Sequence, residues 1–186
     1  MAFINTHINK LKTPKLLTLR MQKDYSKEEL MYKAASYCSL SEHCISEVEE
    51  KLNKWGASES DKSSIIDGLI DEKFIDETRF SNSFVKDKFR FNKWGKTKIA
   101  FAIKVKGIDR FTIAEALDTI HDEEYLELLT ELLKSKLTKI KYESEYEKQG
   151  KLFKFGLSRG FESKFITKAL QALKIETSDI EDFELE

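Results

Sequence analysis

Glycines at near-regular spacing constrain the fold of this 186-residue chain more than any other feature. The stretch Gly107-Ile108-Asp109-x-x-x-Ile113-x-x-Ala116-Leu117 returns 53 positions later as Gly160-Phe161-Glu162-x-x-x-Ile166-x-x-Ala169-Leu170. A looser copy starts at Gly56, 51 residues before Gly107, and has three extra residues between its glycine and its apolar run. Repetition at this spacing indicates one supersecondary unit used three times.

Within each unit, one helix is expected to end at the glycine, which tolerates the left-handed backbone conformation. A new helix should begin one or two residues later. Asp109 is a good N-cap for it, and Glu162 or Ser163 suits the same position in the last copy. The apolar residues that follow are spaced i, i+3 and i+4, which is the pattern of a helix that faces a core.

Composition favours an all-α fold. One proline and seven glycines leave few chain breaks, whereas a β fold needs more turn residues, and 40% hydrophobic residues are enough for a core. Helix-start signals occur at Ser26 with Glu29, a capping box, and at Ser41, Asp76 and Asp122. The fourth helix is expected over 77–92, with Phe80, Phe84 and Phe91 on its apolar side. The signals divide the chain into a basic leader (1–25), three three-helix repeats (26–75, 76–121 and 122–173) and an acidic tail (174–186).

Charge is segregated along the chain, although the net charge is only −1. Residues 79–110 carry ten cations and two anions, whereas residues 115–131 carry seven anions and no cation. Arg79, Lys86, Arg90 and Lys93 follow at steps of seven, four and three, so they should line one helix face without an interleaved acid. The candidate partner-binding residues are these four with Lys96, Lys98, Lys104, Lys106 and Arg159. The alternative is an ordinary solvated helix face.

The sequence offers little support for catalysis or cofactor binding. Cys38 and Cys44 suggest no disulfide framework, fit a reducing compartment and are expected to be buried; with His43 they would make a poor zinc site. Neither a glycine-rich phosphate loop nor a recognisable nucleophile arrangement is present. We therefore expect no enzyme, no metal and no cofactor. Because the sequence lacks both a long apolar run and a signal peptide, we also expect a cytoplasmic protein without a membrane partner. Trp55 and Trp94 are expected in the core.

The middle of the chain resembles a known family, the RecX regulatory proteins. The residues that carry the resemblance are Phe74-Ile75-Asp76-Glu77-Thr78-Arg79-Phe80, Phe84-Val85, Trp94-Gly95, Ile99 and Lys106-Gly107-Ile108. These residues look like the family's middle repeat. Leu52-x-x-Trp55-Gly56 and Ser158-Arg159-Gly160-Phe161 resemble its flanks, and the likeness covers about residues 30 to 173.

The resemblance implies an elongated, curved array of three three-helix repeats, about nine helices, that lies along the helical groove of a RecA–DNA filament. Family members typically restrain RecA: they hinder filament extension, ATP-linked strand exchange and the coprotease activity of the SOS response. No cofactor or catalytic centre goes with that role, and a monomer with at most weak affinity for single- or double-stranded DNA is expected. The alternatives are a direct DNA- or RNA-binding module of helix-turn-helix type and a helical scaffold for another partner.

Overall fold

The computed structural model describes the backbone of residues 24–181 and the side chains of residues 24–173. Its helices are α1 (Lys27–Cys38), α2 (Ile45–Trp55), α3 (Glu59–Asp71), α4 (Glu77–Arg90), α5 (Lys96–Lys104), α6 (Arg110–Asp118), α7 (Asp122–Leu137), α8 (Glu145–Arg159) and α9 (Ser163–Glu181). No strand occurs in this described part. The expected all-α fold of about nine helices is confirmed.

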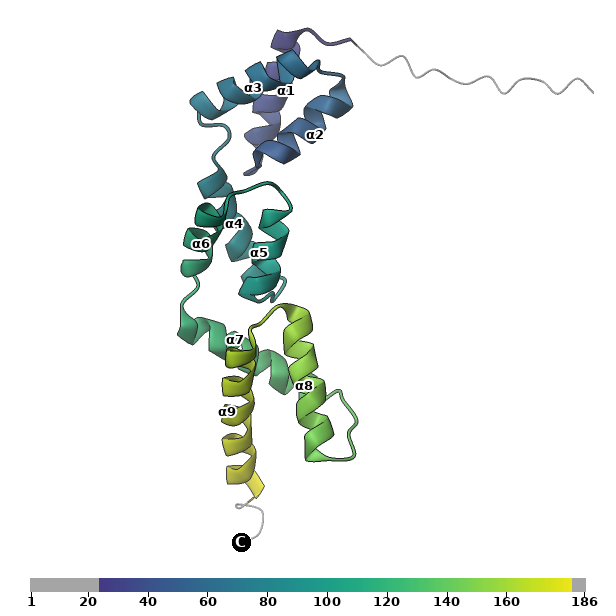
Figure 1. The fold of residues 1–186 in the computed structure, drawn as a ribbon, viewed down its shortest axis with the longest axis vertical. Helices are drawn as coiled ribbons and strands as arrows, with labels where there is room; N and C mark the ends of the chain where they lie inside the picture. Colours follow the sequence, from purple (N-terminus) through teal and green to yellow (C-terminus); the bar gives the residue numbers. More distant parts are fainter. Residues whose placement is uncertain (1–23, 182–186) are drawn as a thin grey trace, which may run out of the picture.

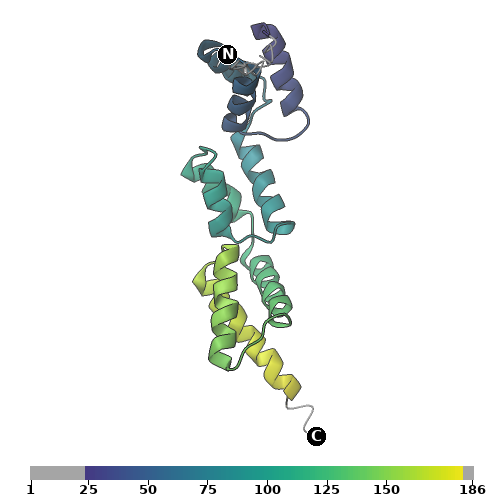
Figure 2. The same cartoon turned by 90° about the vertical axis from the view of Figure 1, so that its right-hand side faces the viewer.

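The helices pack in consecutive groups of three, α1–α3, α4–α6 and α7–α9. The groups follow one another along the long axis of the molecule, so the body is elongated rather than compact (Figures 1 and 2). Of the two terminal segments expected from sequence, the leader lies outside the described residues except for its last two positions. Helix α9 continues to Glu181, into the stretch expected as an acidic tail.

Local capping chemistry fixes where several helices begin. Ser26 and Glu29 form the expected capping box, because each side chain accepts a hydrogen bond from the other residue's backbone N–H. Asp76 accepts from the N–H of Arg79 at 2.9 Å, and Asp109 caps α6. These three predictions are confirmed.

The repeat glycines adopt the left-handed conformation that the sequence pattern requires. The φ angles of Gly56, Gly107 and Gly160 are 85°, 88° and 87°. Gly56 and Gly160 are the C-caps of α2 and α8, and Gly107 lies in the turn between α5 and α6. Gly56 and Gly160 therefore end α2 and α8, whereas α5 ends at Lys104 and Gly107 lies in the turn that follows it. In each unit the next helix can then fold back.

Two details of the prediction are wrong. Helix α2 begins at Ile45 rather than just after Ser41, whose hydroxyl instead bonds the His43 ring at 2.9 Å. Helix α4 ends at Arg90, and Phe91 is 80% exposed instead of buried. The chain turns there through Lys93, with φ 56°, and the Trp94 N–H bonds back to the Lys88 carbonyl at 3.0 Å. Phe91 thus lies beyond the last turn, where no neighbouring helix covers it.

The described residues contain two separate hydrophobic cores. One belongs to α1–α3 and is built on Leu30, Val48, Leu52, Ile65 and Leu69. The other runs continuously through α4–α9 and consists of the following buried residues, among others: Val85, Phe89, Ile99, Ile103, Ile113, Tyr125, Leu129, Leu133, Phe161 and Ile166. Helices α4–α9 therefore form one packed body, to which the α1–α3 unit is attached.

The buried Tyr125 ring joins the second and third helix groups. It contacts the rings of Phe161 and Phe165 at centroid distances of 4.9 Å and that of Phe89 at 6.0 Å. Its hydroxyl donates to Glu162 and accepts from the Lys96 N–H. Trp55 and Trp94 are both half-buried and pack against the cores of their own groups.

Candidate partner-binding surface

The outward side of α4 carries the most accessible members of the predicted basic set. Lys86 is exposed and forms no ion pair with any described residue. Arg90 lies 3.8 Å from Glu124, and the two side chains are 55% and 47% exposed. An exposed pair of this kind contributes about 0–1 kcal/mol. Both cations thus remain available to a partner.

Arg79 has a different role, because it ties α4 to the first helix group. Its guanidinium donates to both Glu42 carboxylate oxygens, at 3.0 and 3.2 Å, and to the Lys73 carbonyl at 3.0 Å. The hydrogen bond to Glu42 raises the pKa of Arg79. Contrary to the sequence interpretation, acids do reach this face. Asp76, the N-cap of α4, lies 3.8 Å from Arg79, and Glu42 comes from the first helix group, which helical spacing within α4 could not reveal.

Lys106 also lies in the joint between the first two groups. Its ammonium is 2.5 Å from Glu47 of α2, and its carbonyl accepts from the Ser46 hydroxyl at 2.8 Å. Burial tends to raise the pKa of Glu47, but hydrogen bonds from Lys106 and His43 together hold it below its ordinary value. The joint therefore contains a charged contact beside an apolar one, since the buried Cys44 of the first group packs in the α4–α9 core.

Three further predicted cations lie between the second and third groups. Lys93 follows α4 rather than continuing its register, and its carbonyl accepts from the Arg159 guanidinium at 3.3 Å. Arg159 also donates to the Asn92 carbonyl. The Lys96 ammonium bonds the Ile120 carbonyl at 2.9 Å and lies 3.6 Å from Asp122. These contacts use Lys96 and Arg159 to hold the body together.

Helix α5 carries further accessible residues. Lys104 is exposed, and the ammonium of the half-buried Lys98 lies 4.8 Å from the centre of the Trp94 ring. Sequence reasoning missed Phe101 and Val105, which are 69% and 70% exposed on the same helix. The available signal in the sequence was the i, i+4 spacing of these two residues. This spacing is offset from that of the buried pair Ile99 and Ile103.

Lys88 and Phe111 were also missed. The ammonium of Lys88 lies 4.9 Å from the Phe84 ring centre and 5.5 Å from that of Trp94. Phe111, at the start of α6, is 68% exposed and stacks under the Arg110 guanidinium at 4.7 Å. Large apolar groups on a surface often mark interaction sites.

The accessible residues of α4 and α5 are considered together as one surface. We call Lys86, Arg90, Lys98, Phe101, Lys104 and Val105 the α4–α5 surface.

The cysteines and His43 are structural. Cys38 and Cys44 are buried thiols, as predicted, and burial raises the pKa of Cys38 to about 11. The His43 ring stacks on Tyr37 at 3.8 Å and bonds Glu47 at 2.8 Å. Among the described residues, no group of three or more His, Cys, Asp or Glu side chains is placed to hold a metal ion. No helix between residues 24 and 181 is long and apolar enough to cross a bilayer.

These features define an all-α repeat protein that exposes several of the predicted cations on its central helices. Its described fold matches the crystal structure of RecX from Lactobacillus salivarius with a TM-score of 0.74 and 26% identity, over 80% of this chain and 97% of that one. A second crystal structure, of a regulatory protein RecX, matches with a TM-score of 0.70 at 21% identity, over 78% of this chain and 73% of that one.

The sequence comparisons agree with the structural ones. Residues 76–117 match the family profile described as RecX, second three-helix domain. The regulatory protein RecX of Clostridium botulinum is 32% identical over 62% of this chain and 54% of its own length. That of Lactobacillus johnsonii is 28% identical over 81% of this chain and 56% of its own length. This chain is therefore similar to the RecX regulatory proteins in sequence and in fold, as the resemblance predicted. It spans about half the length of these two relatives.

Proposed function

We propose that this protein regulates RecA by binding along the helical groove of the RecA–DNA filament, and that it restrains filament extension, ATP turnover and coprotease activity. The observation that supports this role best is the exposure of Lys86, Arg90 and Lys104 on helices at the middle of an elongated body. Lys86, Arg90 and Lys104 remain exposed after the structural cations are set aside. It acts as a monomer in the cytoplasm, without a cofactor.

The accessible cations would meet acidic protein side chains or phosphates in the groove. Complementary charge of this kind mainly increases the association rate and the specificity. The exposed apolar pair Phe101 and Val105 supplies the component that salt does not screen, because buried apolar area contributes about 25 cal/mol per Å². We therefore assign contact to the whole α4–α5 surface and not to the nine predicted cations equally.

The three-group body also suits a long binding site. The α4–α9 body has a continuous core and would bind as one unit, whereas α1–α3 has its own core and a polar attachment. We retain the division into repeats at 26–75, 76–121 and 122–173 as part of this proposal.

The test is to titrate the protein into RecA assembled on single-stranded DNA and to follow ATP turnover. We expect turnover to fall as the protein approaches the concentration of RecA. Unchanged turnover and unchanged filament length at a stoichiometric excess would overturn the proposal. The same protein, denatured and kept unfolded before it is added to RecA, is the control for nonspecific effects.

A second function, direct binding to DNA or RNA, is favoured by one feature. Phe101 and Phe111 are exposed on helices that also carry Lys104 and Arg110, and aromatic rings with cations form stacking platforms for single-stranded bases. Affinity for naked nucleic acid that falls steeply with added salt would support this function. Binding that requires RecA would support the first.

A further inference from the structure

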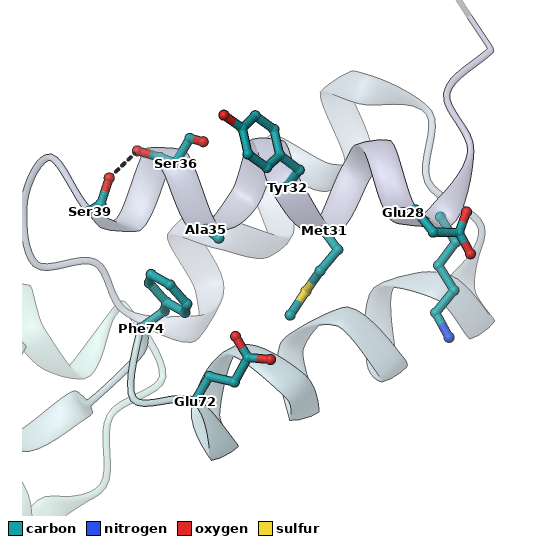
Figure 3. A pocket seen from close by; sticks show the side chains of 9 residues that line it. Glu28, Met31, Tyr32, Ala35, Ser36, Ser39, Glu72 and Phe74 are labelled. Atoms are coloured by element: carbon teal, nitrogen blue, oxygen red, sulfur yellow. Dashed lines mark hydrogen bonds between the residues drawn. The ribbon is translucent and has the colours of Figure 1, made fainter.

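A groove on the first helix group has no part in the proposed function. It lies between α1 and the carboxyl end of α3, has a volume of about 620 Å³, and is formed in part by Met31, Ala35 and Phe74 (Figure 3). Tyr32 stands at its edge and is 76% exposed. The volume falls within the range of about 300–1,000 Å³ that is typical of sites for small molecules. The groove can therefore accept several apolar side chains.

Gly68 determines where the Met31 side chain lies in this groove. Gly68 of α3 lies opposite Met31, and a Cβ at Gly68 would approach the Met31 Cε to 3.2 Å. The absence of a side chain there lets the thioether extend toward α3 (Figure 3). Methionine is flexible and polarizable, and it adapts to irregular apolar partners.

The rim of the groove is more acidic than basic. Glu28 of α1 and Glu72, the C-cap of α3, line it on opposite sides, whereas Lys27 is the sole cation of the lining residues. The Lys27 ammonium is engaged by the Ser64 hydroxyl at 2.7 Å. A ligand that combines apolar groups with positive charge would thus complement the groove.

Such a segment exists in the same chain, immediately before α1. Residues 1–23 contain five cations and no acid. Their apolar residues include Leu11, Leu16, Leu17 and Leu19. The described chain starts at Asp24, three residues before Lys27 at the groove edge, so the segment needs no long connection to reach it.

We propose that residues 1–23 bind in the α1–α3 groove of their own chain, with leucines against Met31 and Phe74 and cations near Glu28 and Glu72. A short tether gives an effective concentration on the order of millimolar. An intrinsic affinity in the millimolar range is then enough to fill about half of the grooves. This inference is independent of RecA binding.

Methyl NMR of the full-length protein tests the proposal directly. The methionines are Met1, Met21 and Met31, so ¹³C-methyl labelling gives three signals, one of them from the groove. A nitroxide is attached at Thr6→Cys; Cys38 and Cys44, which are 8% and 0% exposed, should react far more slowly. We expect the Met31 signal to have at most half the intensity that it has in the same sample after chemical reduction of the nitroxide.

The nitroxide can approach Met31 without any binding, because the ends of a free chain of 20 residues lie only roughly 25 Å apart. The loss in the wild type is therefore compared with the loss in variants. The loss should shrink at least twofold in Leu16→Ser/Leu17→Ser and in Glu28→Lys/Glu72→Lys. Glu49→Lys/Glu131→Lys makes the same charge change at exposed sites on α2 and α7 and should leave the loss unchanged. Equal losses in the wild type and the leucine variant would overturn the proposal.

A mixing experiment distinguishes binding within one chain from binding to a second copy of the chain. Chains with ¹³C-methionine and no nitroxide are mixed with unlabelled chains that carry it. A Met31 loss in the mixture as large as in the doubly labelled chain would mean that the segment binds a second copy, which contradicts binding within one chain. No loss in the mixture, with the full loss in the doubly labelled chain, supports the proposal.

Discussion

Gly95 and Gly160 meet where the second and third helix groups come together. The Gly95 N–H donates to the Arg159 carbonyl at 2.8 Å, and the Thr97 N–H donates to the Gly160 carbonyl at 3.1 Å. A Cβ at Gly95 would lie 2.2 Å from the Gly160 carbonyl oxygen. The two backbones can approach this closely only because neither residue has a side chain.

Gly95→Ala should therefore destabilise the protein by about 1–3 kcal/mol, because backbone atoms must shift to admit the methyl group. The control is Gly150→Ala, since a Cβ at Gly150 within α8 meets nothing within 4 Å. The Gly150→Ala substitution should raise the free energy of unfolding by about 0.5–1 kcal/mol. Urea unfolding of both variants measures the two shifts, and a Gly95 variant as stable as wild type would show that the junction is not tightly packed.

Tyr125→Phe tests the other residue on which the same junction depends. The change keeps the ring and removes the hydroxyl that serves Glu162 and the Lys96 N–H. Burial, with the hydrogen bond to Glu162, raises the pKa of Tyr125, so the phenol stays neutral in this role. Leaving the two partners unsatisfied should lower the free energy of unfolding by about 1–3 kcal/mol. Thermal unfolding measures the loss; Tyr146→Phe, at a 90% exposed position, should cause none.

At the scale of elements, the joint between α1–α3 and α4–α9 depends on ionised groups. The pKa of Glu47 is lower in the folded chain than its ordinary value of 4.5. The contribution of the Glu47–Lys106 pair is thus complete above about pH 4.5 and is lost as the pH falls through the lower, folded value. The contribution of the hydrophobic cores of α1–α3 and α4–α9 to stability does not depend on pH in this way.

The stability difference between wild type and Glu47→Gln should consequently be largest near pH 7 and shrink below pH 4.5. Urea unfolding of both proteins over this pH range measures it. Glu49→Gln, an exposed neighbour on α2, provides the control and should differ little from wild type at any pH. A difference that stays constant down to pH 3 would contradict the assignment of the joint to this ion pair.

Helix boundaries show how far sequence reasoning reaches at this scale. Capping residues act within one turn, so Ser26, Asp76 and Asp109 were identified from sequence alone. The end of α4 was not, because it depends on Lys93 adopting a left-handed conformation that non-glycine residues rarely take. Phe91 was consequently assigned to the core and is exposed.

Across the whole molecule, the cations divide into those that hold the body together and those that face outward. If the proposed function holds, triple substitution Lys86→Glu/Arg90→Glu/Lys104→Glu should weaken the proposed effect on RecA at least tenfold while leaving the unfolding midpoint almost unchanged. Arg79→Glu should instead lower stability, because it breaks the contacts with Glu42 and Lys73. ATPase titration and thermal unfolding of the same samples separate the two outcomes. Equal losses of stability in both variants would remove the distinction between the two sets.

Glycine stops, caps and apolar spacing are local and periodic, so the repeated unit, its helices and the resemblance to the RecX proteins could be identified from the amino-acid sequence. It also located the cations, but not their roles. Only the tertiary structure decided that Arg79, Lys96, Lys106 and Arg159 bind other groups of helices while Lys86 and Lys104 face outward. A long charged side chain takes its partner from whichever helices meet, and Glu42 and Glu47 reach Arg79 and Lys106 only when the first two helix groups stack.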